Sequence, residues 1–242
     1  MIYYINKLKT KFNKIALDLR EIKKQNEELL WAQIYHDSIR GFDAIESLNL
    51  NIGRWAGNYP FFYVLTRILN DYKPKFILEL GLGESSKFIS TFIHHYAPNS
   101  KHIIVEQNEE WTNDFRRRFT LTAQSSVIHC ELVSRKVNNF YVASYKDFDK
   151  KINVHFDLYV IDGPFGSDRY SRYDIVSLVE KFNDNDFIIL LDDNERIGEK
   201  ETSDEIIRIL NNKYIKNYST VFSGLKSVRV IVSEKYKYLI SI

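Results

Sequence analysis

Strands and helices alternate along most of this sequence, and the alternation limits the possible folds more than any other feature. Short apolar runs typical of strands lie at 76–80, 102–106, 127–132, 156–162 and 187–192, and segments with helical spacing lie at 61–72, 86–96, 109–119 and 173–182. Such alternation predicts a parallel sheet covered by helices on both faces. After a last helical segment at 203–211, strand-like runs at 220–222, 228–232 and 236–240 predict an antiparallel ending.

The predicted fold class is therefore α/β, a doubly wound Rossmann-like sheet with a C-terminal antiparallel hairpin. The stretch NIGRWAGNYP, at 51–60, is rich in turn residues and marks the start of this sheet domain. We expect residues 1–50 to form an N-terminal helical extension and residues 51–242 to form the domain. A chain of 242 residues is long enough for one such domain with an appendage.

The stretch FILELGLGESSKFIS, at 76–90, joins a buried strand to a helix through a turn with two glycines. In a doubly wound sheet, ligands bind beyond the carboxyl ends of the strands, where a helix N-terminus offers free N–H groups. Gly81 and Gly83 occupy that place, but Ser86 stands where a dinucleotide fingerprint has its third glycine. Glu79 would repel a pyrophosphate, so the turn favours a cationic ligand over NAD.

The segment ILELGLGES resembles motif I of the class I S-adenosylmethionine-dependent methyltransferases, whose ligand carries an ammonium and a sulfonium group. The resemblance implies that Glu79 orients the methionine moiety and that Gly81, Gly83 and Ser85 belong to the cofactor site. The second strand ends at Glu106 in HIIVEQNEE. A carboxylate there is placed to accept both ribose hydroxyls of the adenosine.

Acidic residues also end two later strands. Asp162 follows one strand, and Asp192, Asp193 and Asn194 follow the next, so we expect both groups at the edge that carries the glycine turn. Carboxylates so close repel one another unless a divalent cation or a proton neutralises them. Their hard oxygen ligands favour Mg²⁺ over Mn²⁺ or Ca²⁺. The alternative is that Asp193 or Asn194 caps the helix that follows.

These acids also resemble those of metal-dependent O-methyltransferases. Catechol-type enzymes have an aspartate in the place of Asp162 and an Asp-Asn pair matching Asp193 and Asn194. Macrocin-type sugar O-methyltransferases have an Asp-Asp pair that matches 192 and 193, so the register stays open. The lysine that catechol-type enzymes carry after the first aspartate is replaced by Ser167, which leaves Asp168 as the nearest candidate base beside Asp162. A surface ion pair with Arg169 is the alternative role for Asp168.

The first thirty residues carry an apolar stripe with alternating spacings of three and four. Its members are Ile5, Leu8, Phe12, Ile15, Leu19, Ile22, Asn26 and Leu29. Asn26 falls at an a position of the heptad, where a polar residue sets the register of parallel two-stranded coiled coils. The pattern predicts a homodimer through this helix. Two alternatives are a helix packed on its own domain and a membrane-surface helix, whose basic character Asp18 and Glu21 interrupt.

The composition limits the partners. A net charge of +2 from 34 basic and 32 acidic residues makes no case for nucleic acid. The single cysteine excludes an internal disulfide and fits a reducing compartment. No apolar run is long enough to span a bilayer, and lysines interrupt the N-terminus where a signal peptide would need an apolar core. We therefore expect a cytoplasmic protein, with no contact to a membrane beyond its surface.

Together these features predict an S-adenosylmethionine-dependent O-methyltransferase that acts on a hydroxyl of a saccharide or another small molecule, assisted by Mg²⁺ or Mn²⁺. Two alternatives stay open. One is a metal-independent methyltransferase whose aspartates bind sugar hydroxyls. The other is a catalytically silent scaffold subunit that binds S-adenosylmethionine and dimerises through its N-terminal helix.

Overall fold

The main sheet is mostly parallel. The structure is a computed structural model that describes residues 2–183 and 185–241, with side chains from residue 9 onward. Within this part of the chain, seven strands form one sheet in the order β3-β2-β1-β6-β7-β9-β8. They are β1 (Phe76–Leu80), β2 (Lys101–Glu106), β3 (Ser125–His129), β6 (Leu158–Ile161), β7 (Ile188–Leu191), β8 (Asn217–Ser223) and β9 (Ser227–Ser233). Among these strands, only the β7–β9 and β9–β8 pairs are antiparallel, which confirms the predicted fold class.

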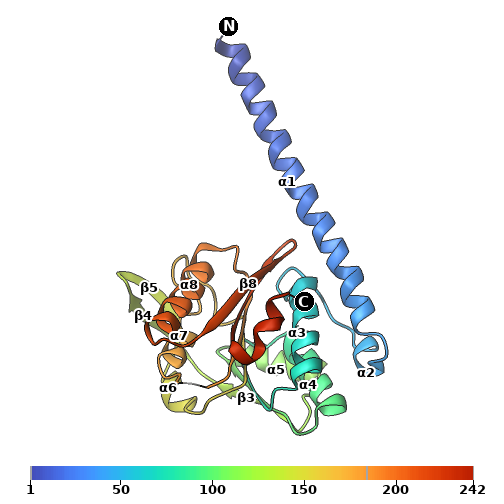
Figure 1. Cartoon of the computed structure of the whole chain (residues 1–242), viewed down its shortest axis with the longest axis vertical. Coiled ribbons are helices and arrows are strands. Elements are labelled where there is room, and N and C mark those ends of the chain that lie inside the picture. The colour runs from blue at the N-terminus through green and yellow to red at the C-terminus, as the bar shows by residue number, and fades with distance from the viewer. Residues whose placement is uncertain (1, 184, 242) are drawn as a thin grey trace.

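Helices cover both faces of the sheet (Figure 1). They are α1 (Ile2–Ser38), α2 (Asp43–Glu46), α3 (Tyr59–Tyr72), α4 (Glu84–Tyr96), α5 (Glu109–Arg118), α6 (Phe148–Lys151), α7 (Asp174–Val179), α8 (Ile197–Asn212) and the 3₁₀ helix η1 (Glu234–Ser241). Apolar side chains of α3, α4 and the end of α1 pack on one face. Those of α6, α7 and α8 pack on the other. Because both faces are covered, the central strands are apolar along most of their length.

Two segments differ from the sequence-based expectation. The run predicted as a strand at 236–240 is wrong, because it lies in η1, where Tyr236 and Leu239 pack into the core. A separate hairpin of β4 (Leu132–Val137) and β5 (Phe140–Tyr145) was not predicted. Its turn is Asn138-Asn139, with φ of 47° and 73°, and this left-handed pair matches the right-handed twist of two-residue hairpins.

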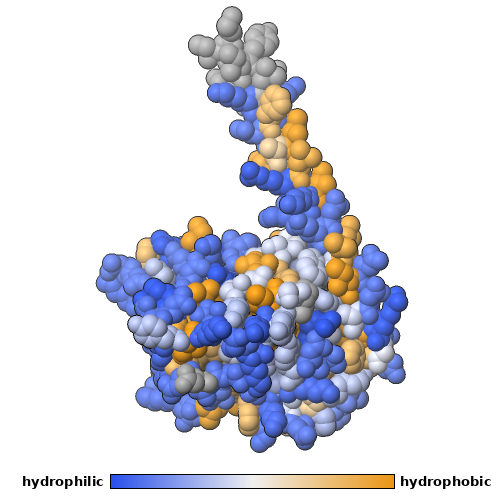
Figure 2. Space-filling view, viewed as in Figure 1, coloured by the Kyte–Doolittle hydropathy of each residue, from blue (hydrophilic) through white to orange (hydrophobic). Residues whose placement is uncertain are grey.

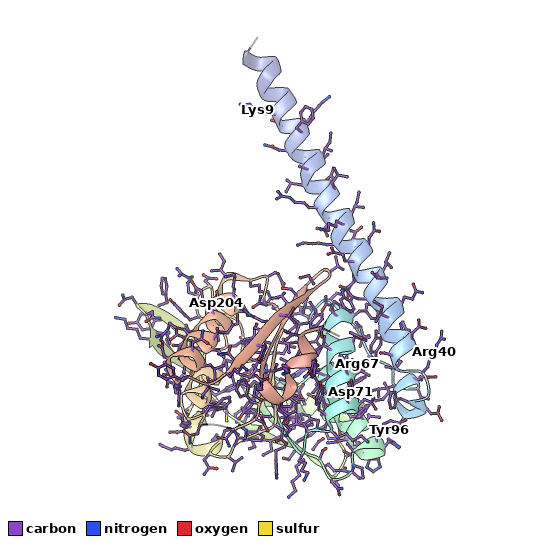
Figure 3. The ribbon with its side chains drawn as sticks, in the orientation of Figure 1. Lys9, Arg40, Arg67, Asp71, Tyr96 and Asp204 are labelled. Atoms are coloured by element: carbon purple, nitrogen blue, oxygen red, sulfur yellow. The ribbon has the colours of Figure 1, made fainter. Side chains whose placement is uncertain are left out.

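The long helix α1 is anchored only over its second half. Trp31 donates from Nε1 to the Ser223 carbonyl at 2.9 Å and packs against Tyr63, with ring centroids 5.4 Å apart. Tyr35 is buried in the core beside Phe62. The first half stands clear of the domain, and Lys9 lies near its free end in Figure 3, far from the ion pair of Arg67 and Asp71 on α3. No described helix is both long and apolar enough to cross a membrane.

The exposed half of α1 keeps the apolar stripe open to solvent. Phe12, Ile15, Leu19 and Ile22 are between 51% and 69% exposed, and Figure 2 shows apolar side chains running along the protruding helix. The alternative that the helix packs on its own domain is therefore wrong for residues 12–22. The first two positions of the stripe, Ile5 and Leu8, have side chains outside the described residues. Ile39 and Ile45 pack in the core. The domain boundary at residue 50 stays a prediction.

Candidate functional site

The carboxyl ends of β1, β6 and β7 lie side by side. The Asp162 N–H donates to the Leu80 carbonyl at 3.0 Å, and the Asp192 N–H donates to the Ile161 carbonyl at 3.1 Å. The strand order reverses between β1 and β6, because β2 and β3 continue to one side and β7 to the other. That reversal is where doubly wound sheets bind ligands.

The turns after β1 and β6 approach each other closely. Gly81 has φ of 99°, a region that favours glycine. A Cβ at Gly163 would lie 2.8 Å from the Gly81 nitrogen. The backbone at the strand reversal therefore needs glycine on both sides.

Glu79 lies below this turn and faces the protein. It is fully buried, and its Oε1 accepts a hydrogen bond from Ser85 Oγ at 2.5 Å. Its Oε2 lies 3.0 Å from His102 Nε2. These bonds fix the first turn of α4 to β1 and β2. A direct contact of Glu79 or Ser85 with a cofactor stays a prediction.

Glu106 holds the glycine turn against the end of β2. Its Oε2 accepts from the Leu82 N–H at 2.9 Å, and its Oε1 accepts from the N–H groups of Gln107 and Asn108, each at 2.8 Å. Burial raises the pKa of this carboxyl group, and the three N–H donors oppose that effect. A carboxylate has about four acceptor positions. Glu106 therefore keeps capacity for one further donor, and its ribose contact stays a prediction.

A cavity of about 450 Å³ lies beside Glu106, beyond the ends of β2 and β3. Its volume falls within the range of small-molecule sites, roughly 300–1,000 Å³. Gln107 and His129 line it, and both contribute a buried atom, Oε1 and Nδ1, with no hydrogen-bond partner among the described residues. Buried polar atoms without partners are rare, so Gln107 and His129 each hold an unsatisfied polar group next to the cavity that they line.

The cavity is also acidic. Glu109, Glu110 and Glu131 line it, together with the exposed ring of Phe165. No residue for an adenine contact was predicted from the sequence, and His129 was not among the predicted site residues. His129 is in fact the last residue of β3 and reaches the cavity. It was missed because the predicted strand ran on to residue 132, whereas β3 ends at His129.

Three carboxylates meet where β6 and β7 end, as the sequence predicts. One oxygen from each of Asp162, Asp192 and Asp193 lies within 4.8 Å of the others. Asp192 and Asp193 are almost fully buried, and the side chain of Asp162 keeps 21% of its surface exposed. Asn194 does not complete this group, because its Oδ1 accepts from Ser203 Oγ at 2.9 Å. The predicted helix cap at Asp193 or Asn194 is wrong, since Arg196 occupies the N-cap position of α8.

Arg172 lies within the carboxylate group, and the sequence-based reasoning did not include it. Its Nη2 is 3.0 Å from Asp162 Oδ1 and 2.7 Å from Asp193 Oδ2. Its Nη1 donates to the carbonyls of Asp192 and Ile161, at 3.0 and 3.4 Å. The guanidinium group is thus fixed to the ends of both strands.

Lys226, in the β8–β9 turn, reaches the same group from the opposite side. Its Nζ is 3.1 Å from Asp192 Oδ2 and 2.9 Å from Asp193 Oδ1. It also donates to the Ala56 carbonyl at 3.0 Å. The two cations thus pair with one oxygen of Asp162, one oxygen of Asp192 and both oxygens of Asp193, whereas Asp192 Oδ1 is buried without a hydrogen-bond partner among the described residues. A divalent cation bound to all three aspartates would compete with Arg172 and Lys226 for these carboxylates. The residues around the three aspartates therefore do not fit a divalent cation without moving Arg172 or Lys226.

Burial and the neighbouring charges shift the pKa values of Asp162 and Asp193 in opposite directions. Burial raises the pKa of Asp162 to about 7, although Arg172 opposes the change. Burial also acts to raise the pKa of Asp193, but Arg172 and Lys226 outweigh it and hold that pKa below its usual range. Asp193 is therefore the carboxylate that stays ionised most firmly in this group.

Asp168 is exposed in the loop after β6, and no described hydrogen bond or ion pair joins it to the aspartates. The predicted ion pair with Arg169 is wrong, because Arg169 donates from Nε to Glu201 Oε1 at 2.6 Å. Its guanidinium group also lies over the Phe140 ring, 4.4 Å from the centroid. A catalytic role for Asp168 stays a prediction.

The comparisons with known proteins concern the fold. No family model and no curated protein matches the sequence. Among solved structures, the O-methyltransferase TomG of Streptomyces achromogenes, in complex with SAM, has a TM-score of 0.49 at 10% identity, over 84% of this chain and 88% of that chain. A putative caffeoyl-CoA O-methyltransferase from Staphylococcus aureus has a TM-score of 0.47 at 12% identity, over 86% and 99%. A putative O-methyltransferase from Klebsiella pneumoniae has a TM-score of 0.46 at 10% identity, over 84% and 89%.

Proposed function

We propose that this chain binds S-adenosylmethionine at the ends of β1, β2 and β3 and transfers its methyl group. The observation that carries the proposal is the cavity beside Glu106, with the unpartnered atoms of Gln107 and His129 in its lining. An adenine base has both donors and acceptors along its edge, which suits these two atoms. The glycine turn at 81–83 adjoins Glu106 and would take the methionine part of the cofactor.

Electrostatics favour this cofactor over a dinucleotide. Among the described residues, the cavity lining includes Glu109, Glu110 and Glu131 and no lysine or arginine, and Lys146 pairs with Glu131 at 3.0 Å. A phosphate near these acids would be repelled, whereas S-adenosylmethionine carries no phosphate.

Calorimetry with S-adenosylmethionine, its demethylated product and NAD⁺ tests this proposal. We expect the first two to bind and NAD⁺ not to bind. Gln107→Ala removes one neutral hydrogen bond, so we expect affinity for the cofactor to fall by up to about tenfold. Gln25→Ala, on the exposed half of α1, is the matched control and should leave affinity unchanged. Preferential binding of NAD⁺ would refute the proposal.

We propose a hydroxyl of a saccharide or another small molecule as the methyl acceptor. Asp162 supports this, because its partly exposed carboxylate lies at the end of β6, next to the glycine turn. In the reaction, the acceptor oxygen forms a bond to the methyl carbon as the sulfur–methyl bond breaks, and Asp162 receives the hydroxyl proton. The chain's contribution is mainly to align these groups. Labelled cofactor offered to a library of acceptors would reveal turnover, and binding without turnover would favour the scaffold alternative.

A metal-assisted version of this proposal follows the catechol-type or macrocin-type enzymes, in which Mg²⁺ or Mn²⁺ would take part in the methyl transfer. Asp162, Asp192 and Asp193 would be the ligands, and the ion would lower the pKa of the acceptor hydroxyl. The position of Arg172 between Asp162 and Asp193 favours the metal-independent form instead.

The single cysteine, Cys130, is buried and free, which supports a reducing cytoplasm as the location.

We also propose that α1 pairs with α1 of a second copy as a parallel coiled coil. Its apolar stripe is exposed along the half that leaves the domain. With Asn26 at an a position, Asp18 falls at g and Lys23 at e, so a parallel pair brings each Asp18 to the partner copy's e-position lysine. An antiparallel pair would instead bring the e-position residues Lys9 and Lys23 together. The charges therefore favour the parallel arrangement.

A further inference from the structure

The carboxylates at the ends of β6 and β7 are matched by cations from three separate segments. Arg172 comes from the loop before α7, Lys226 from the β8–β9 turn, and Arg196 from the start of α8. Arg196 Nη1 is 2.9 Å from Asp193 Oδ2 and approaches from the solvent side, with 52% of its side chain exposed. Within the described residues, the three aspartates thus face three cations, and a fourth carboxylate, Glu199, has its Oε1 3.8 Å from both Arg172 Nε and Arg196 Nη1.

Arg172 and Lys226 each bridge two carboxylates. Arg172 joins Asp162 to Asp193, and Lys226 joins Asp193 to Asp192. A divalent ion would have the same effect, because it coordinates oxygen atoms from neighbouring strands and so holds the carboxylates together.

Neither cation is free to leave. The side chains of Arg172 and Lys226 are 4% and 13% exposed, respectively. Arg172 also donates to two main-chain carbonyls at the strand ends, and Lys226 to the Ala56 carbonyl. Moving either group would leave these acceptors without a partner, and burying an unpaired charge is strongly unfavourable.

The backbone supports the same arrangement. Arg172 and Asp193 have φ of 58° and 60°, in the left-handed region that residues with a Cβ rarely adopt. Such conformations persist where the surrounding contacts determine them. Two facing partners of one ion pair, both held in this region, indicate that the fold is organised around their contact.

We propose that Arg172 and Lys226 are permanent counter-cations of this site and take the place of a divalent metal ion between Asp162, Asp192 and Asp193. The site therefore holds its carboxylates together and accepts its ligand without Mg²⁺ or Mn²⁺. The proposal concerns the charge balance of the cluster and stands whether or not the chain transfers methyl groups. Its failure is thus distinct from a failure to bind S-adenosylmethionine.

The first test is a titration of the full-length, chelator-treated protein with Mn²⁺, followed by the electron paramagnetic resonance signal of the free ion. We expect no stoichiometric binding below about 1 mM, because Arg172 and Lys226 already pair with one oxygen each of Asp162 and Asp192 and with both oxygens of Asp193. The melting temperature should also be the same in chelator and in excess Mg²⁺, since an ion that binds only the folded state would raise it. One equivalent of tightly bound Mn²⁺, or a clear Mg²⁺-dependent rise in melting temperature, would overturn the proposal.

The second test is Lys226→Met, which keeps much of the side-chain volume and removes the charge. Asp192 and Asp193 then lose their shared cation, so we expect a lower melting temperature, a gain of at least about tenfold in Mn²⁺ affinity, and partial recovery of stability with Mg²⁺. Lys200→Met is the matched control, because Lys200 pairs with Asp204 on the surface of α8 and is 62% exposed. The control should gain no affinity.

A folded Lys226→Met variant that neither loses stability nor gains Mn²⁺ affinity would show that Lys226 does not neutralise the cluster. If the variant does not fold, the titration of the unaltered protein decides the question by itself.

Discussion

Asp174 places a buried carboxyl group at the start of α7. Its Oδ1 accepts from Ser144 Oγ at 2.5 Å and from the Tyr145 N–H at 3.1 Å, whereas Oδ2 is buried without a partner among the described residues. Burial raises the pKa of Asp174 to about 6, and the two donors only partly oppose it. The ionised form is therefore unfavourable in the folded state.

A pH-dependent stability follows from this raised pKa. The part of the free energy of unfolding that depends on protonated Asp174 is fully present below the pKa of the unfolded state, about 3.9, and is lost as pH rises through 6. At pH 8 the ionised carboxyl group therefore costs about 3 kcal/mol of stability. Asp174→Asn keeps the acceptor at Oδ1 and cannot ionise. We expect urea unfolding to show the variant more stable than the unaltered protein at pH 8, with the advantage gone at pH 4.

The exposed Asp149, paired with Lys181, provides the control. Asp149→Asn should show no comparable difference between the two pH values. If Asp174→Asn has the same stability relative to the unaltered protein at pH 4 and pH 8, then Asp174 does not titrate in the way described.

Single residues at strand ends were predictable, but their partners were not. Glu106 and Asp162 follow apolar strands, and a parallel sheet sends such residues to one edge. Arg172 and Lys226 lie in a loop and a turn, and only the folded chain brings them to the aspartates. Without them, a metal ion was the reasonable hypothesis for the repulsion between the acids.

At the scale of elements, α1 offers two leucines for a direct test of the coiled coil. Leu19 lies on the stripe and Leu17 on the opposite face, and they are 60% and 63% exposed. In a dimer, Leu19→Asp would place a charge in the apolar seam, whereas Leu17→Asp would remain in solvent. We expect sedimentation to give a monomer for Leu19→Asp and a dimer for Leu17→Asp.

Both variants should keep the melting temperature of the domain, because neither leucine packs against it. A mass that is the same for the two variants would argue against the proposed seam. Asn26, at the next a position toward the domain, is exposed as well, so the seam has room to continue to that point.

Three other elements show where the local sequence was enough to predict the structure and where it was not. The strand at 76–80 was predicted at its observed ends, because the apolar run meets Gly81 directly. The β4–β5 hairpin was missed although β5 is half-buried and rich in aromatic and apolar residues and Asn138-Asn139 is a usable hairpin signal. Its partner β4 is largely exposed and gives no clear strand pattern. The run at 236–240 alternates like a strand but lies in η1. Tertiary packing of Tyr236 and Leu239 overrides the pattern there.

At the scale of the whole molecule, the parallel sheet and its shared edge follow from the alternation of elements, which is why the fold class was accessible from the sequence. The way in which α1 joins the domain could not be predicted from the sequence, because it depends on contacts of Glu28 that form only in the folded chain. This residue is buried, and its Oε1 accepts from the Tyr59 N–H at 2.9 Å. Its Oε2 accepts from Asn58 Nδ2 and from the Leu225 N–H, each at 2.8 Å. One carboxylate thus connects α1, the start of α3 and the β8–β9 turn.

The turn held by Glu28 also carries Lys226, the residue after Leu225, into the carboxylate cluster. Glu28→Ala leaves the N–H groups of Tyr59 and Leu225 without their acceptor, and each unsatisfied donor costs about 1–3 kcal/mol. We therefore expect urea unfolding to show a loss of about 2–5 kcal/mol. Glu27→Ala, which removes an exposed partner of Lys23, should change stability by less than about 0.5 kcal/mol. Equal stabilities for the two variants would show that the domain does not depend on Glu28 to hold α1 and the turn together.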